Sequence, residues 1–155
     1  MRRSLTKVFL FLLFFVGQSG FAYAKSALNL TEAKILIPLK GTTVTAGYGI
    51  FKNSSDQPVN LKIKTVKPFK AAELHETVEK DGKVGMNKVD QIVIPSRGSF
   101  ELKPGSHHMM FFEPSRSLKL DEQLVAEFEE NGKVVTFKFK VVSRETDSSH
   151  GHSHH

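Results

Sequence analysis

Alternation of apolar and polar residues with a period of two is the feature that most constrains the fold of this chain. In residues 135–141 an apolar side chain recurs at every second position, and Thr or Lys occupies the positions between. Apolar residues also recur at every second position in residues 59–64 and 124–129, and in residues 43–52 the alternating apolar residues are Val44, Ala46, Tyr48 and Ile50. Successive side chains of a β-strand point to opposite faces. Each segment is therefore predicted to be a strand with its apolar face in the core and its other face in water.

Turn sequences separate these segments. Asp81-Gly82 and Asn131-Gly132 suit two-residue hairpin turns, because both central residues tolerate a positive φ. About eight strands are expected, drawn from the ranges 27–37, 43–52, 59–67, 71–80, 83–94 with a break, 98–102, 107–113, 123–130 and 133–142. Short strands with frequent turns and no long helical pattern predict an all-β domain, an antiparallel sandwich or barrel.

The N-terminus has the order of a secretory signal peptide. Basic residues within positions 2–7 precede an apolar run at 8–16, and Ala22-Tyr23-Ala24 follows. The apolar run is shorter than the about 20 residues that a transmembrane helix needs, which disfavours the alternative of an uncleaved anchor. We expect cleavage after Ala24 and a periplasmic protein without a membrane span.

The mature chain is then expected to hold a folded domain at 25–142 and a flexible polar tail at 143–155. Removal of the signal leaves 19 basic and 16 acidic residues, so the net charge falls from +6 to +3. This charge is too small to indicate nucleic-acid binding. The 155 residues include no Cys, which excludes disulfides, thiolate metal sites, thiol catalysis and lipid attachment through a leading Cys.

His and Met residues gather at two places in the predicted sheet. If Asp81-Gly82 forms a two-residue turn, Met86 pairs with Thr77 and becomes a diagonal neighbour of His75, with backbones about 7–8 Å apart. In the strand at 107–113, alternation places His108 and Met110 on one face and His107 and Met109 on the other.

Together the two places offer two imidazoles and two thioethers, all neutral. Thioethers prefer Cu(I), and imidazole also accepts it, whereas zinc normally takes thiolates, carboxylates or more His. The alternative is that the Met residues fill the core and that the His residues are ordinary strand residues. Every Met of the mature chain lies near a His, in sequence or across the hairpin, and this concentration favours a metal site.

The spacing of these residues resembles a family signature. It reads H-x10-M-x21-H-x-M and is formed by His75, Met86, His108 and Met110. This is the signature of the PCuAC family of periplasmic copper chaperones. Residues 48–53, 73–76 and 102–110 also resemble segments of that family, and the resemblance covers about residues 28–142.

The resemblance implies a cupredoxin-like or immunoglobulin-like Greek-key β-sandwich that holds one Cu(I) through His75, Met86, His108 and Met110. It also implies delivery of copper to the CuA subunit of cytochrome c oxidase, often alongside a Sco-type copper chaperone. The chain departs from the family in having Ser106 in place of a usual Gly and in lacking Trp. His107 and Met109 are additional potential ligands, and whether either replaces a motif residue is left open.

The C-terminus carries a second group of potential ligands, His150, His152, His154 and His155. A His-rich flexible end commonly binds divalent metals, so we expect an auxiliary Cu(II) site there. An inert tail and a purification-tag remnant are the alternatives. The Gly and Ser residues that interrupt the His residues favour a native tail.

The function that these patterns predict is a copper chaperone without enzymatic turnover. A blue-copper electron carrier needs a Cys ligand, which this chain lacks. No nucleophile motif indicates an enzyme, and Glu73, Glu76 and Asp90 are interpreted as ordinary surface acids. A periplasmic copper buffer or resistance protein, and a β-sandwich interaction module that binds no metal, remain as alternatives.

Overall fold

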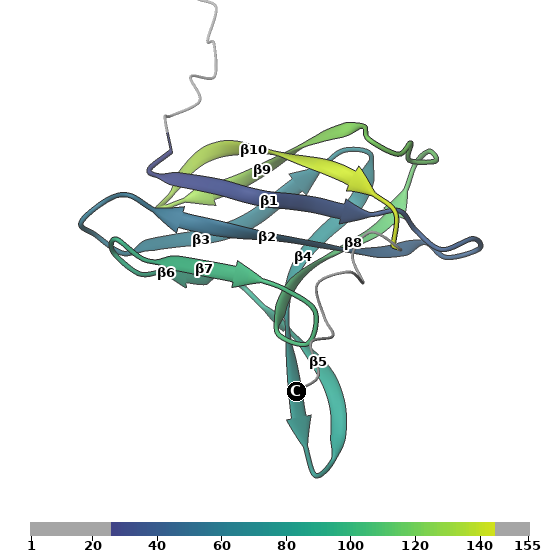
Figure 1. Cartoon of the computed structure of the whole chain (residues 1–155), viewed down its shortest axis with the longest axis horizontal. Coiled ribbons are helices and arrows are strands. Elements are labelled where there is room, and N and C mark those ends of the chain that lie inside the picture. Colours follow the sequence, from purple (N-terminus) through teal and green to yellow (C-terminus); the bar gives the residue numbers. More distant parts are fainter. Residues whose placement is uncertain (1–25, 145–155) are drawn as a thin grey trace, which may run out of the picture.

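The computed structural model describes residues 26–144, and all regular secondary structure in this part of the chain is β-strand (Figure 1). The predicted signal peptide at 1–24 and nearly all of the predicted tail at 143–155 lie outside these residues. The range expected at 83–94 is divided in two, which gives ten strands where about eight were expected. They are β1 (Leu28–Leu36), β2 (Val44–Asn53), β3 (Val59–Val66), β4 (Phe69–Lys80), β5 (Lys83–Val89), β6 (Ile92–Ile94), β7 (Ser99–Leu102), β8 (His107–Pro114), β9 (Gln123–Glu130) and β10 (Lys133–Val142).

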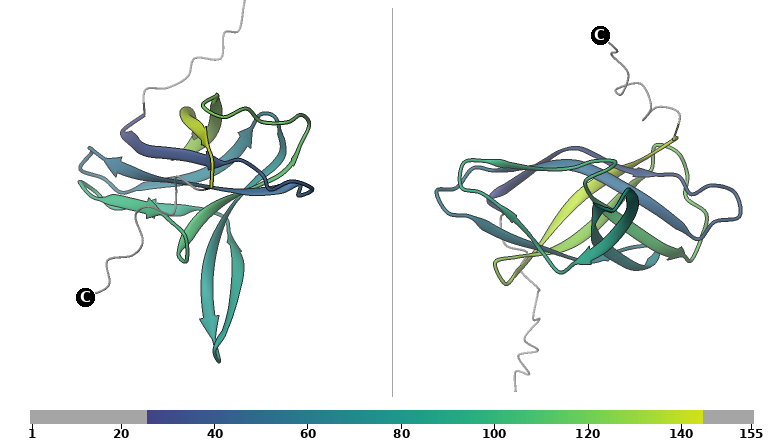
Figure 2. Two further views of the ribbon diagram at one scale, coloured as in Figure 1. Left: turned by 45° about the vertical axis from the view of Figure 1, so that its right-hand side comes forward. Right: turned by 90° about the horizontal axis from the view of Figure 1, so that it is seen from below.

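The strands form one sheet that encloses its own core. Their order is β5-β4-β8-β2-β1-β10-β9-β3-β6, with β7 paired to β2. The described pairings are antiparallel as predicted, except that β1 and β10 run parallel. The Phe51 ring on β2 meets the Phe128 ring on β9 with centroids 5.6 Å apart, although β1 and β10 lie between these strands in the sheet. The sheet must therefore curve back on itself, as Figure 2 shows.

Strand β2 faces the opposite way from the prediction. Thr45 and Phe51 are buried on its core side, whereas Val44, Ala46, Tyr48 and Ile50 are only half-buried. The hydroxyl of Thr45 is satisfied there, because it donates a 2.6 Å hydrogen bond to the Leu36 carbonyl. A Cβ atom at position 47 would lie 2.6 Å from a ring carbon of Phe111, so Gly47 lets that ring pack against the strand. Thr45, Gly47 and Gly49 thus face the core together with Phe51. The apolar side chains predicted to face the core lie on the outer face of β2 instead.

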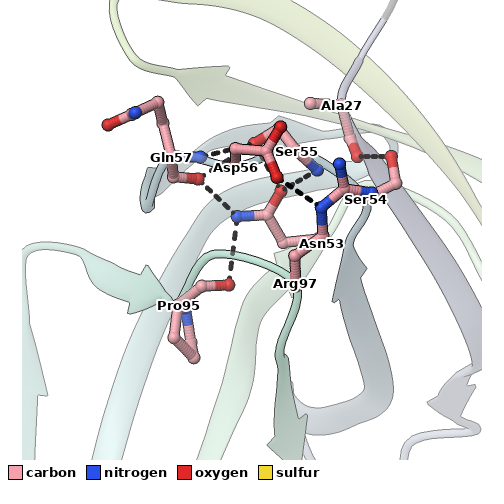
Figure 3. Close-up of polar contacts among 8 residues, drawn as sticks. All are labelled: Ala27, Asn53, Ser54, Ser55, Asp56, Gln57, Pro95 and Arg97. Atoms are coloured by element: carbon pink, nitrogen blue, oxygen red, sulfur yellow. Dashed lines mark hydrogen bonds and ion pairs between the residues drawn. The ribbon is translucent and has the colours of Figure 1, made fainter.

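A polar cluster holds the far end of β2. Asn53 is 4% exposed, and its amide nitrogen donates to the carbonyls of Gln57, Ile94 and Pro95 at 2.8, 3.3 and 3.1 Å. Its amide oxygen accepts hydrogen bonds from the backbone N–H and hydroxyl of Ser55 at 2.9 and 2.8 Å. Figure 3 shows the contacts with Ser55, Gln57 and Pro95, which join the turn after β2 to the turn after β6. We call this cluster the Asn53 corner, comprising residues 53–57 and 94–97.

The β4–β5 hairpin extends away from the body of the sheet (Figure 1). Its turn is the predicted one, since Lys80 pairs with Lys83 and Asp81 and Gly82 have φ values of 54° and 71°. Strand β5 lies at one end of the sheet order, and its Met86 side is open, with Met86 58% exposed. The hairpin thus carries one of the four motif residues out to the surface. Between residues 26 and 144 no helix is long and apolar enough to cross a membrane.

Candidate metal centre

The sheet register brings the four motif residues to one face of three adjacent strands. Thr77 on β4 pairs with Met86 on β5, so Met86 is the diagonal neighbour of His75 that the sequence predicts. On the other side of β4, His75 pairs directly with His108 of β8, and their rings lie 6.0 Å apart between centroids. Met110 follows two positions after His108 and therefore shares its face. We call this surface of β5, β4 and β8 the His–Met face, defined by His75, Met86, His108 and Met110.

The two additional candidates, His107 and Met109, lie on the opposite face of β8. Met109 is fully buried in the hydrophobic core. The His107 ring packs edge-on against Phe100 with centroids 5.0 Å apart, and its Nε2 lies 3.7 Å from a carboxylate oxygen of Glu76. Both are therefore turned away from the His–Met face, in agreement with the predicted alternation.

An open hollow of about 340 Å³ borders the His–Met face. Met86, His108 and Met110 line it together with the outward side of β2. Arg144, at the end of the described chain, lines the same hollow. The predicted auxiliary ligands His150, His152, His154 and His155 lie outside the described residues.

Hydrogen bonds select one free nitrogen on each imidazole. Nδ1 of His108 lies 2.9 Å from the Ser106 carbonyl, which can only accept, so Nδ1 carries the proton and Nε2 keeps its lone pair. Nε2 of His75 lies 2.8 Å from a carboxylate oxygen of Glu73 and donates to it, which leaves the lone pair on Nδ1. That Nδ1 atom is buried and has no hydrogen-bond partner among the described residues. A metal ion would satisfy it, and imidazoles that bind metals normally donate their other N–H in this way.

Glu73 was predicted to be an ordinary surface acid, and this prediction is wrong. Its side chain is 26% exposed and accepts hydrogen bonds from His75 through one oxygen and from Lys88 through the other, the latter at 2.7 Å. The hydrogen bond from Lys88, followed by that from His75, holds the pKa of Glu73 below its usual value. The spacing could have revealed this residue, because two positions before His75 is the same face of the strand.

The donor set of this face is suited to a soft, singly charged ion. No group of three or more His, Cys, Asp or Glu residues able to hold a metal occurs within residues 26–144. The other motif side chains that the strand register places on this face are the thioethers of Met86 and Met110. Thioethers favour Cu(I), whereas zinc sites are normally built from thiolates, imidazoles and carboxylates.

Comparisons with known proteins agree with this fold. The LpqE-like family model matches residues 28–141. The solution structure of Cu(I)-bound DR1885 from Deinococcus radiodurans is 25% identical with a TM-score of 0.63, over 83% of this chain and 86% of that one. The copper-bound PCuAC domain of PmoF2 is 22% identical with a TM-score of 0.61, over 78% of this chain and 97% of that domain. No curated protein matches the chain. The predicted resemblance to PCuAC domains and the predicted cupredoxin-like fold are confirmed.

Proposed function

Because the chain belongs to the LpqE-like family and has the fold of PCuAC domains, we propose that it is an exported copper chaperone that binds Cu(I). The proposed ligands are His75, Met86, His108 and Met110. The observation that carries the proposal is the buried, unpaired Nδ1 atom of His75, which lies on a strand paired in register with His108. An unsatisfied buried acceptor is costly in a folded protein, and a bound metal ion accounts for it.

The arrangement suits an ion that must be both held and released. The four ligands are neutral, so the complex keeps the single positive charge of Cu(I), and no thiolate has to be formed. Without Cys, the site cannot be lost to disulfide formation in an oxidising compartment. Met86 is largely exposed at the open side of the hairpin, where an acceptor can approach its sulfur. We propose that copper passes through a transient complex in which donor and acceptor share ligands, with no enzymatic turnover.

The comparisons support copper as the cargo. DR1885 is described as bound to Cu(I), and the PmoF2 domain as bound to copper. We propose the CuA subunit of cytochrome c oxidase, a Sco-type chaperone, or both as acceptors, on the basis of the resemblance to PCuAC chaperones. Export through a signal peptide cleaved after Ala24 belongs to the same proposal, as does an auxiliary Cu(II) site at His150, His152, His154 and His155. The LpqE-like family is named for a putative lipoprotein, but lipid attachment is not part of this proposal, because the sequence has no Cys to receive a lipid.

The test is a Cu(I) titration of the mature protein against a competing chelator. We expect one tightly bound Cu(I) in the wild type and in a variant shortened after Arg144, because the folded face supplies the ligands. Met86→Ala combined with His108→Ala should abolish competitive binding in both backgrounds. An undiminished binding curve in this double variant would overturn the proposed site.

The chaperone role is tested separately, by mixing the Cu(I)-loaded protein with a copper-free CuA domain. A transfer rate that rises with acceptor concentration is expected for a shared-ligand complex. A rate independent of acceptor concentration would indicate release into solvent, and would favour a copper buffer over a chaperone.

A further inference from the structure

A chain of three side chains runs along the His–Met face. Lys88 on β5 donates to one oxygen of Glu73 at 2.7 Å, and the other oxygen of Glu73 accepts from Nε2 of His75 at 2.8 Å. Lys88 also pairs with His75 across β4 and β5, while Glu73 pairs with Met110 across β4 and β8. One carboxylate therefore contacts one proposed ligand and lies across from another, while a cation from the third strand holds it in place.

We infer that Glu73 is a positioning residue that fixes His75 with its Nδ1 atom free to bind the metal. The inference rests on the proposed function. Neutral imidazole carries one N–H and one lone pair, and a carboxylate can only accept. Donation from Nε2 to Glu73 therefore assigns the lone pair to Nδ1, the atom that is buried and unpaired. Lys88 occupies the second oxygen, which restricts rotation of the carboxylate.

Glu73 is the carboxylate hydrogen-bonded to a proposed ligand in this face, and its charge is paired with that of Lys88. Carboxylates that support metal-binding His residues both orient the ring and raise its basicity.

Strands β4 and β8 carry a comparable pair without this role. Lys70 on β4 and Glu113 on β8 form an ion pair at 2.9 Å, but the Glu113 side chain is 59% exposed and its ion-pair partner is Lys70, not a His residue. An exposed pair of this kind contributes little to stability. Glu113 is therefore a control for removing a Lys-paired carboxylate from this part of the sheet.

The first experiment uses metal-free protein with 15N-labelled His and long-range 1H–15N NMR, which reports the protonated nitrogen of each ring. We expect the Nε2–H tautomer for His75 in the wild type and in Glu73→Gln, whose amide oxygen can still accept. In Glu73→Ala the ring keeps its intrinsic preference for Nε2–H but loses the acceptor, so we expect the Nε2 proton signal to move upfield and the proton to exchange faster with water; in Glu113→Ala we expect no change. An Nε2 proton of His75 that is unchanged in Glu73→Ala would overturn the positioning role.

The second experiment measures Cu(I) affinity of the same variants by chelator competition. Loss of a carboxylate that supports a metal ligand typically lowers affinity about 10–100-fold, which is the expectation for Glu73→Ala. Glu73→Gln should fall between this variant and the wild type, and Glu113→Ala should match the wild type. Equal affinities of Glu73→Ala and Glu113→Ala would refute the inference and leave the proposed function intact. A wild type that binds no Cu(I) would instead refute the proposed function, while the Nε2 proton of His75 measured without metal would still decide the role of Glu73.

Discussion

Two polar clusters flank strand β2, and they use their hydrogen-bonding capacity differently. At the Asn53 corner, three carbonyls accept from the amide nitrogen of Asn53 and two Ser55 groups donate to its oxygen. On the His–Met face, whose Met110 pairs with Ala46 near the other end of β2, the buried Nδ1 of His75 has no hydrogen-bond partner among residues 26–144. A satisfied buried cluster stabilises the fold, whereas an unsatisfied atom costs stability unless a ligand binds. The difference distinguishes a structural cluster from the proposed binding site.

The largest effect on Cu(I) affinity is expected from removing two proposed ligands from the His–Met face. Met86→Ala and His108→Ala should each lower Cu(I) affinity by at least about 100-fold, and together by about 10⁴-fold, or about 5.5 kcal/mol. The midpoint of urea unfolding without metal should change little for Met86→Ala, because Met86 is exposed. Chelator competition and urea unfolding on the same samples measure both quantities. A double variant that loses stability but still binds Cu(I) would show that the His–Met face is a structural cluster and not a copper site.

The corresponding change at the Asn53 corner should affect stability alone. Asn53→Ala removes the side chain that binds the backbone N–H of Ser55 and three backbone carbonyls. These groups lose a hydrogen-bond partner, so the free energy of unfolding should fall by about 3 kcal/mol. Urea unfolding of the metal-free protein measures this loss. Cu(I) affinity of the folded variant should equal that of the wild type. A large fall in affinity would show that the two clusters are coupled through β2.

Neighbouring Met residues on β8 give a finer test. Met110→Leu removes a thioether from the His–Met face and should lower Cu(I) affinity by about 100-fold, with little effect on folding. Met109→Leu removes one from the core, where a swap of similar volume should cost less than about 1.5 kcal/mol and leave affinity unchanged. Chelator competition and thermal unfolding measure the pair. Similar Cu(I) affinities for the two variants would argue against placing Met110 on the His–Met face and Met109 in the core.

The smallest expected effect concerns the core side of β2. Gly47→Ala places a Cβ 2.6 Å from a Phe111 ring carbon and should cost about 2 kcal/mol of stability. Gly85→Ala is the control, because its Cβ would meet only Val78, at 3.8 Å. Urea unfolding compares the two, and both should retain copper binding. Equal stabilities would contradict the packing described for β2.

Local sequence patterns predicted much of this structure because they depend on neighbours along the chain. The turn at Asp81-Gly82 fixed the register of Met86 against Thr77, and alternation separated Met110 from Met109. The prediction of which face of β2 points to the core was wrong. The ring of Phe111, which is distant in sequence, packs against Gly47 and so requires that residue on the core side.

The candidate site was predictable only in part. Pairing of His75 with His108 depends on the order of strands in the sheet, which no local pattern contains. The role of Glu73 was also missed, since a single Glu on a strand usually faces solvent. Its hydrogen bonds to His75 and Lys88 became apparent only once β4 and β5 were paired. The ligand roles themselves stay a prediction.

X-ray absorption spectroscopy of the mature protein with one equivalent of Cu(I) tests the central claim most directly, because it counts the sulfur and imidazole ligands of the bound ion. The account predicts two sulfur and two imidazole ligands in the full-length protein and in the variant shortened after Arg144. It also predicts loss of one sulfur in Met86→Leu. A copper shell without sulfur, or one that disappears when the residues after Arg144 are removed, would contradict the account.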